Sequence, residues 1–214
     1  MGIPVLIYGK SGCGKSTSLR NFGEDEVFMI KVVNKPNPFR KQFKYCKATD
    51  DIELIKTGLL KMPCKAAVVD DAGYLMTNLY MNVKTANSFD KYDKIANVMW
   101  TLVNYVISEL PPDVIVYVIM HEDVDDMGNC KPLTLGKLLD NKVNLPGMFT
   151  IALHAQKNGK NYVFRTQTDG LDVAKSPLEM FDAEEIPNDL KEVDTTIRKY
   201  YGFNNIKKEN NQQA

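Results

Sequence analysis

Residues 9–17, GKSGCGKST, carry the spacing Gly-x-x-x-x-Gly-Lys-Ser near the start of the chain. Glycines in such a loop let successive backbone N–H groups turn inward around an anion. The lysine reaches the terminal phosphates of a bound nucleotide, and the next hydroxyl contacts magnesium. The motif therefore predicts a site for a nucleoside triphosphate and Mg²⁺, with Lys15 as a catalytic residue. The expected nucleotide contacts are Gly9, Lys10, Ser11, Gly12, Cys13, Gly14, Lys15, Ser16 and Thr17.

Acidic side chains follow two other apolar runs, where a second magnesium anchor is expected. Asp70 ends a run of small and branched apolar residues, and an aspartate at such a strand end completes the metal site of many phosphate loops. We therefore expect Ser16 and Asp70 to hold the metal ion. Asp71 and Glu122 are alternatives for positioning the attacking water. His121, next to Glu122, could reach the same place. The competing interpretation is that the two aspartates are only a solvated strand end.

These residues must be positioned by alternating strands and helices. Residues 3–8 form an apolar, β-branched run typical of a buried parallel strand, and 15–22 can form a helix that ends at Gly23. Similar patterns continue along the chain, which indicates one α/β domain with a mainly parallel sheet flanked by helices. Further expected elements are strands at 27–33, 66–69, 114–120, 149–153 and 162–166, and helices at 50–61, 92–110, 133–142 and 189–201.

The remaining segments are expected to be irregular. The stretch 74–90 is mixed in composition and predicted to be loop-rich, and 121–131 is predicted to be a polar loop. Asn158-Gly159-Lys160 lies between two strand patterns and predicts a C-terminal β-hairpin. The domain is expected to span 1–203, followed by a polar, disordered tail at 204–214.

Composition limits the possible classes of protein. The chain has 214 residues and a formal net charge of zero, so any nucleic-acid binding must come from a local patch. No apolar stretch has membrane-spanning length, and the start lacks a signal-peptide pattern. The cysteines at 13, 46, 64 and 130 show no paired zinc spacing and no redox motif, which favours reduced thiols in a cytoplasm.

Two other classes of nucleotide-binding protein compete with an ATPase. A nucleotide or small-molecule kinase normally closes a basic lid over the phosphates, whereas residues 122–126 here are acidic. An ATP-gated scaffold would bind nucleotide without appreciable turnover. A regulatory GTPase is disfavoured because Asn141-Lys142-Val143-Asn144 lacks the aspartate of the guanine-reading motif.

Longer stretches of the chain allow a resemblance to be stated. The chain resembles the small ATP-binding proteins of tailed phages, which are RecA-like core ATPases associated with single-strand annealing and recombination. The stretches that carry it are IPVLIYGKSGCGKSTSLRNF, NKPNPFR, VVDDAGYLMTN, LPPDVIVYVIMHED, GKLLDNKVNLPGMFTIAL and FRTQTDGLDVAKSPLEMF.

The resemblance implies an additional-strand P-loop fold with strand 114–120 between the phosphate-loop strand and the Asp70 strand. It implies ATP hydrolysis with Mg²⁺ in a host-cell cytoplasm, action on single-stranded DNA, and a single-strand binding protein as a possible partner. Lys15 and Ser16 match its nucleotide residues and Asp70 its magnesium residue. One departure is that residues 31–35 contain no acid where RecA proteins carry a catalytic glutamate.

A basic, aromatic segment is the candidate DNA contact. Six basic residues and no acidic residue occur between Lys31 and Thr49. Basic groups that follow phosphates, with rings that stack on bases, bind single strands without sequence preference. The alternative is a surface loop with its aromatic rings packed into the core, and the resemblance offers 80–91 as a second DNA loop. The candidate contacts are Lys35, Phe39, Arg40, Lys41, Lys44 and Tyr45.

The resemblance also implies self-association. Arg165 and Lys175 flank the segment TQTDGLDVA, just past the expected hairpin, where RecA-like proteins present basic residues to a neighbouring subunit's nucleotide. A cation supplied in this way is worth about 10³–10⁵ in rate. We therefore expect a homo-oligomer, with local surface contacts by these two residues as the alternative.

Overall fold

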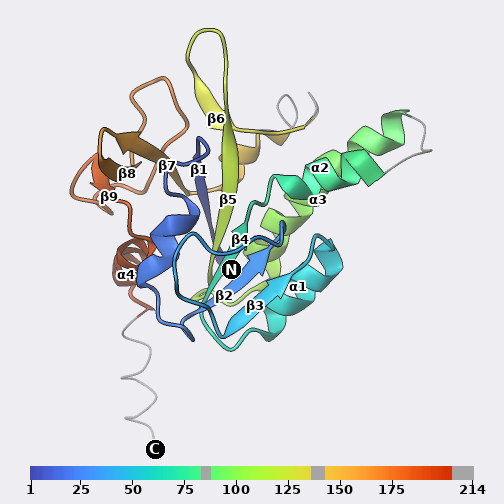
Figure 1. Cartoon of the computed structure of the whole chain (residues 1–214), viewed down its shortest axis with the longest axis horizontal. Helices are drawn as coiled ribbons and strands as arrows, with labels where there is room; N and C mark the ends of the chain where they lie inside the picture. Colours follow the sequence, from blue (N-terminus) through green and yellow to red (C-terminus); the bar gives the residue numbers. More distant parts are fainter. Residues whose placement is uncertain (83–87, 136–142, 204–214) are drawn as a thin grey trace, which may run out of the picture.

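The chain folds around a mixed, mostly parallel β-sheet flanked by helices (Figure 1). The structure is a computed structural model that describes residues 1–82, 88–135 and 143–203. The strand order across the sheet is β3-β2-β4-β5-β1-β7-β8-β9, and β6 pairs with β5 outside this path. The strands are β1 (Ile3–Gly9), β2 (Val27–Lys31), β3 (Tyr45–Ala48), β4 (Ala66–Asp70), β5 (Ile115–Val124), β6 (Cys130–Pro132), β7 (Ile151–Asn158), β8 (Asn161–Arg165) and β9 (Glu185–Pro187).

The central strands are parallel, so their carboxyl ends meet at one edge of the sheet. β5 lies between β1 and β4, in the order that the resemblance implies, and pairs in parallel with both. The register places Gly9 opposite His121 and Lys31 opposite Asp70. This edge therefore brings together the phosphate loop (residues 9–17), the end of β4 and residues 121–122 of β5, which is where open α/β sheets bind ligands.

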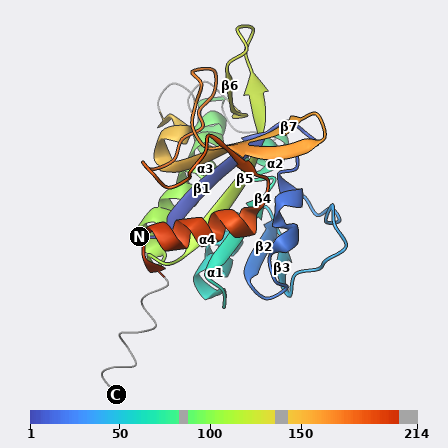
Figure 2. The same ribbon diagram turned by 90° about the vertical axis from the view of Figure 1, so that its left-hand side faces the viewer.

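Helices cover both faces of the sheet. One face packs against α1 (Ile52–Lys61), α2 (Tyr74–Asn82) and α3 (Ser88–Glu109). The other packs against the short 3₁₀ helix η1 (Ser16–Asn21) and α4 (Leu190–Tyr200), which crosses the strands in Figure 2. A second 3₁₀ helix, η3 (Leu145–Met148), precedes β7. In the described residues no helix combines the length and apolarity needed to cross a membrane.

Two cores on opposite faces explain the uninterrupted apolar strands. In β1, Leu6 and Tyr8 belong to the core under α3, whereas Val5 and Ile7 belong to the core under η1 and α4. A strand buried on both faces reads as a continuous apolar run, because neither face meets water. This is the pattern that made β1, β4 and β5 predictable from sequence.

The C-terminal hairpin is confirmed. β7 and β8 are antiparallel, with Asn158 opposite Asn161. Gly159 has φ +62°, a left-handed value that suits glycine in a two-residue turn. Two further strands, β3 and β9, were not predicted. They lie at the two ends of the strand order and have only four and three residues, and about half of their residues are exposed, so neither forms the continuous apolar run of a buried strand.

Two irregular segments were predicted wrongly. Within 74–90, residues 74–82 form α2 because Leu75 and Met76 are buried in the core beside α3, and α3 itself begins at Ser88. The expected polar loop at 121–131 instead contains the end of β5 and the start of β6, which form an antiparallel hairpin held by backbone pairing. Most of the expected helix at 133–142, and the tail at 204–214, lie outside the described residues.

Candidate active site

The phosphate loop connects β1 to η1 at the carboxyl edge of the sheet. Gly12 and Gly14 have φ values of +79° and +91°, which glycine adopts without steric cost. Gly9 is needed for a different reason, because a Cβ there would lie 2.3 Å from the carbonyl oxygen of Ala155 on β7. The glycine spacing is therefore explained by two left-handed positions and one close approach to a neighbouring strand. The helix that follows is a short 3₁₀ helix, so it brings less helix dipole to the loop than a long α-helix would.

Lys15 lies inside this loop. Its ammonium group donates to the carbonyl oxygens of Gly9 and Lys10, both at 2.7 Å, and the residue is 6% exposed. Burial lowers the pKa of Lys15 from its usual range, while nearby acidic groups oppose that shift. A positive group is thus held among the loop glycines, where a polyphosphate would neutralise it.

Ser16 and Asp70 meet although 54 positions separate them. The Ser16 hydroxyl donates to Asp70 Oδ1 at 2.9 Å, from the start of η1 to the end of β4. Burial is the main cause that raises the pKa of Asp70, the charge of Asp71 adds to it, and the Ser16 hydrogen bond opposes it. A hydroxyl and a carboxylate are hard oxygen ligands of the kind that Mg²⁺ prefers. The two residues therefore fit a magnesium site.

Asp71 lies in the same cleft as the phosphate loop. It has φ +58°, an uncommon value that aspartate tolerates better than most residues, and it is buried. Its carboxylate forms an ion pair with Lys35 and lies 3.6 Å from His121 Nε2. Hydrogen bonding to Asp71 raises the pKa of Lys35, whereas burial and the charge of Lys15 lower the pKa of His121. The cleft has a volume of about 270 Å³ and its walls include Lys15, Ser16, Lys35, Asp71 and His121.

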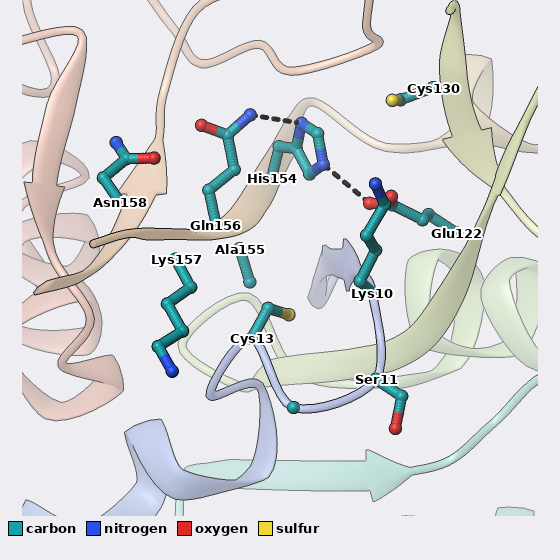
Figure 3. A pocket seen from close by; sticks show the side chains of 11 residues that line it. Lys10, Ser11, Cys13, Glu122, Cys130, His154, Ala155, Gln156, Lys157 and Asn158 are labelled. Carbon is teal, nitrogen blue, oxygen red and sulfur yellow. Dashed lines mark hydrogen bonds and ion pairs between the residues drawn. The ribbon is translucent and has the colours of Figure 1, made fainter. Parts of the chain in front are cut away.

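Glu122 lies on the other side of the loop. It follows His121 on β5, and its Oε2 lies 2.8 Å from His154 Nε2 (Figure 3). It lines a different cavity, of about 420 Å³, together with Lys10 and Cys13. The two candidate water-positioning acids are therefore separated, and Asp71 is the one that shares a cleft with Lys15 and Ser16.

Sequence reasoning missed the cluster around His154. The His154 ring stacks on Tyr8, with ring centres 4.6 Å apart, and its Nδ1 lies 2.9 Å from Asp172 Oδ2. The Gln156 amide is also 3.1 Å from Nδ1. Asp172 and His154 come from a loop and a strand 18 positions apart, so no spacing rule links them. A polar histidine inside the apolar β7 pattern was the one available signal.

Arg165 and Lys175, which were expected to contact a second subunit, both make contacts within their own chain. Arg165 forms an ion pair with Asp169, and a second one with Glu185 at 4.0 Å. The backbone of Lys175 exchanges two hydrogen bonds with Ala152 of β7. These contacts match the alternative interpretation for Arg165, and contacts to a second subunit stay a prediction.

The basic, aromatic segment divides into packed and exposed residues. Phe39 packs against the core and makes an edge contact with the buried Phe43, at 5.9 Å between ring centres. Lys41 donates to the carbonyl oxygens of Arg20 and Phe22, at 2.9 and 2.6 Å, and so caps the end of η1.

Among the other candidate DNA contacts, Lys35 pairs with Asp71 in the phosphate cleft. Arg40 and Lys44 are exposed, and the ammonium of Lys44 lies 5.4 Å from the centre of the half-buried Tyr45 ring. The second candidate loop, 80–91, includes residues 83–87, which lie outside the described residues. The exposed cations of the first segment are thus Arg40 and Lys44, together with the partly paired Lys35.

Comparisons with known proteins were made for the whole chain. No protein-family model matches it, and no curated protein matches it either.

Proposed function

We propose that this chain is a magnesium-dependent ATPase with a RecA-like, additional-strand P-loop fold. The observation that carries the proposal is the 2.9 Å hydrogen bond between Asp70 and Ser16, next in sequence to Lys15, whose ammonium group is held inside the loop. A loop lysine, a hydroxyl and a strand-end aspartate are the groups that P-loop NTPases use for phosphate and metal. The position of β5 between β1 and β4 supports the same group of folds.

In this proposal each group has a separate task. The loop amides and Lys15 bind the β- and γ-phosphates, and Ser16 and Asp70 hold Mg²⁺, which neutralises charge that develops on the phosphate oxygens. Asp71 accepts a hydrogen bond from the attacking water, while its ion pair with Lys35 fixes the carboxylate. His121, at 3.6 Å from Asp71, lies where it can contact the γ-phosphate or that water.

We further propose that the ATPase acts with single-stranded DNA in phage recombination, annealing or replication, in the host-cell cytoplasm. Exposed Arg40 and Lys44, with Lys35 at the rim of the phosphate cleft, support contact with a polyanion near the nucleotide. The resemblance of the sequence to small phage ATPases supports the same role. A homo-oligomer and a single-strand binding partner are part of this proposal.

Phosphate release measured with and without single-stranded DNA tests the function. We expect wild-type turnover that requires Mg²⁺ and increases with DNA. Lys15→Ala should lose at least about 10²-fold in turnover, because the missing ammonium stabilises charge that develops in the transition state. Lys47→Ala, on the edge strand β3, is the matched control and should keep wild-type turnover. Equal turnover in Lys15→Ala and wild type would disprove the assignment of the active site.

A further inference from the structure

The cavity beside the phosphate loop contains a group of metal-ligating side chains that the proposed ATPase does not require. Glu122 on β5, Cys130 on β6 and His154 on β7 each direct one ligand atom into the same space, as Figure 3 shows. Their ligand atoms all lie within 4.8 Å of one another. Bonds of about 2.0–2.3 Å to a tetrahedral zinc separate ligand atoms by roughly 3.3–3.6 Å. Small side-chain rotations would therefore bring the three atoms onto one ion.

The surroundings of His154 favour a cation. Both ring nitrogens face carboxylates, Nε2 toward Glu122 at 2.8 Å and Nδ1 toward Asp172 at 2.9 Å. A neutral imidazole has one N–H and can satisfy only one of these oxygens. If Nδ1–H donates to Asp172, the Nε2 lone pair points at a second negative group. A metal ion between Nε2 and the Glu122 carboxylate removes that repulsion.

Asp172 supplies the second layer of such a site. Metal-binding histidines usually donate their other N–H to a carboxylate, which fixes the ring and raises its basicity as a ligand. The side chains of Asp172 and His154 are 4% and 5% exposed, and Tyr8 stacks on the ring within 8° of parallel. The ring is thus held in one orientation before any ligand binds.

From this geometry we propose that Glu122, Cys130 and His154 bind a divalent metal ion of the zinc class, with Asp172 as the positioning residue for His154. Thiolate, imidazole and carboxylate together suit Zn²⁺ better than Mg²⁺ or Ca²⁺, which bind oxygen ligands. Three protein ligands leave a fourth position for water or an anion, and it faces the cavity of about 420 Å³ that Lys10 and Gln156 also line. The ion would fasten the β5–β6 hairpin to β7 beside the first residues of the phosphate loop.

Cobalt substitution tests this proposal without reference to ATP. The chelator-treated full chain should bind one Co²⁺ with a thiolate-to-metal charge-transfer band, and Zn²⁺ should displace it. Cys130→Ser should remove the band and weaken binding at least tenfold, whereas Cys46→Ser, at an exposed thiol on β3, should change neither. Asp172→Asn should keep the band and weaken affinity about 10–100-fold. Cobalt bound at Ser16 and Asp70 would give no thiolate band, so the two sites are distinguishable.

A second measurement needs no variant. Zn²⁺ should slow alkylation of Cys130, followed by mass spectrometry, and leave Cys46 unchanged. Zinc at about a hundredfold excess over its Kd should also raise the melting temperature by about 5–10 °C. The proposal is overturned if Co²⁺ gives no thiolate band and Cys130 reacts equally fast with and without Zn²⁺. In that case His154, Glu122 and Asp172 form a hydrogen-bonded cluster without a metal ion.

Discussion

At the scale of single residues, Asp70 is a carboxylate whose burial opposes folding. Burial and the adjacent Asp71 raise the pKa of Asp70. The folded chain therefore binds the proton of this carboxyl group more tightly than the unfolded chain does. Folding stability should then fall as the pH rises above the unfolded pKa of about 3.9. Asp70→Asn removes the charge and keeps an acceptor oxygen for Ser16. We expect it to raise the melting temperature, by more at about pH 7.5 than at about pH 4.5, and to abolish turnover.

Thermal unfolding in magnesium-free buffer at the two pH values measures this effect. The control is Asp25→Asn, because Asp25 is exposed and its charge stays in water in both states. A lower melting temperature for Asp70→Asn, or the same change at both pH values, would contradict the argument. The expected gain in stability with loss of activity is typical of a carboxylate placed for a metal ion.

The choice between Asp71 and Glu122 also belongs to single residues. Asp71→Asn should lower turnover by at least about 10²-fold with little change in ATP affinity, because a water-positioning contact acts mainly in the transition state. Glu122→Gln should lose less, since Glu122 bonds His154 on the opposite side of the loop. Single-turnover hydrolysis and equilibrium binding of ATP separate the two effects. If Glu122→Gln is the slower variant, the roles assigned to these acids are reversed.

At the scale of elements, α4 anchors the helix that follows the phosphate loop. Asp189 caps α4 by accepting from the backbone of Lys191 and Glu192, and it also accepts from the Asn21 side chain at the end of η1. Arg20 donates to the carbonyl oxygen of Asn188 at 2.7 Å. Asp189→Ala should cost about 1 kcal/mol of stability through the lost cap and weaken ATP binding several-fold through η1.

Asp51→Ala is the matched control for that prediction. Asp51 caps α1 in the same way but has no contact with the phosphate loop in the described residues. Chemical unfolding should give similar losses for both variants, whereas calorimetric titration with ATP should show weaker binding for Asp189→Ala alone. Equal ATP affinities would mean that η1 holds its position without α4.

The elements also show what sequence could and could not predict. β1, β4 and β5 were predicted because burial on both faces leaves a continuous apolar run, and α1 and α4 lie within a residue or two of the expected helix bounds. α2 and the β5–β6 hairpin were missed because their stability comes from contacts with α3 and from backbone pairing. The contact between Ser16 and Asp70 could be predicted, because the loop motif names Ser16 and the apolar run before Asp70 places it at a strand end. The His154 cluster depends on three segments meeting in space, which spacing does not encode.

At the scale of the whole molecule, a formal net charge of zero means that local cations must supply any attraction to DNA. The structure reduces the number of candidate DNA contacts in this segment, because Lys41 caps η1 and Phe39 packs into the core. Arg40 and Lys44 remain exposed on one segment. Two exposed cations on a chain without net charge should give binding that depends strongly on salt and little on sequence.

The salt dependence of single-strand binding tests this arrangement. For single strands the log–log slope is about −0.7 per phosphate neutralised, so replacing Arg40 and Lys44 by alanine should reduce its magnitude by about 1.4. The charge-matched control replaces Lys160 and Lys199, which are exposed on the β7–β8 turn and on α4. It should leave the slope unchanged, and ATP affinity should stay the same in both double variants because none of these residues lies in the phosphate motif. If the two double variants bind DNA with equal slopes, the segment between β2 and β3 does not contact the strand, and the DNA-binding face must lie elsewhere on the molecule.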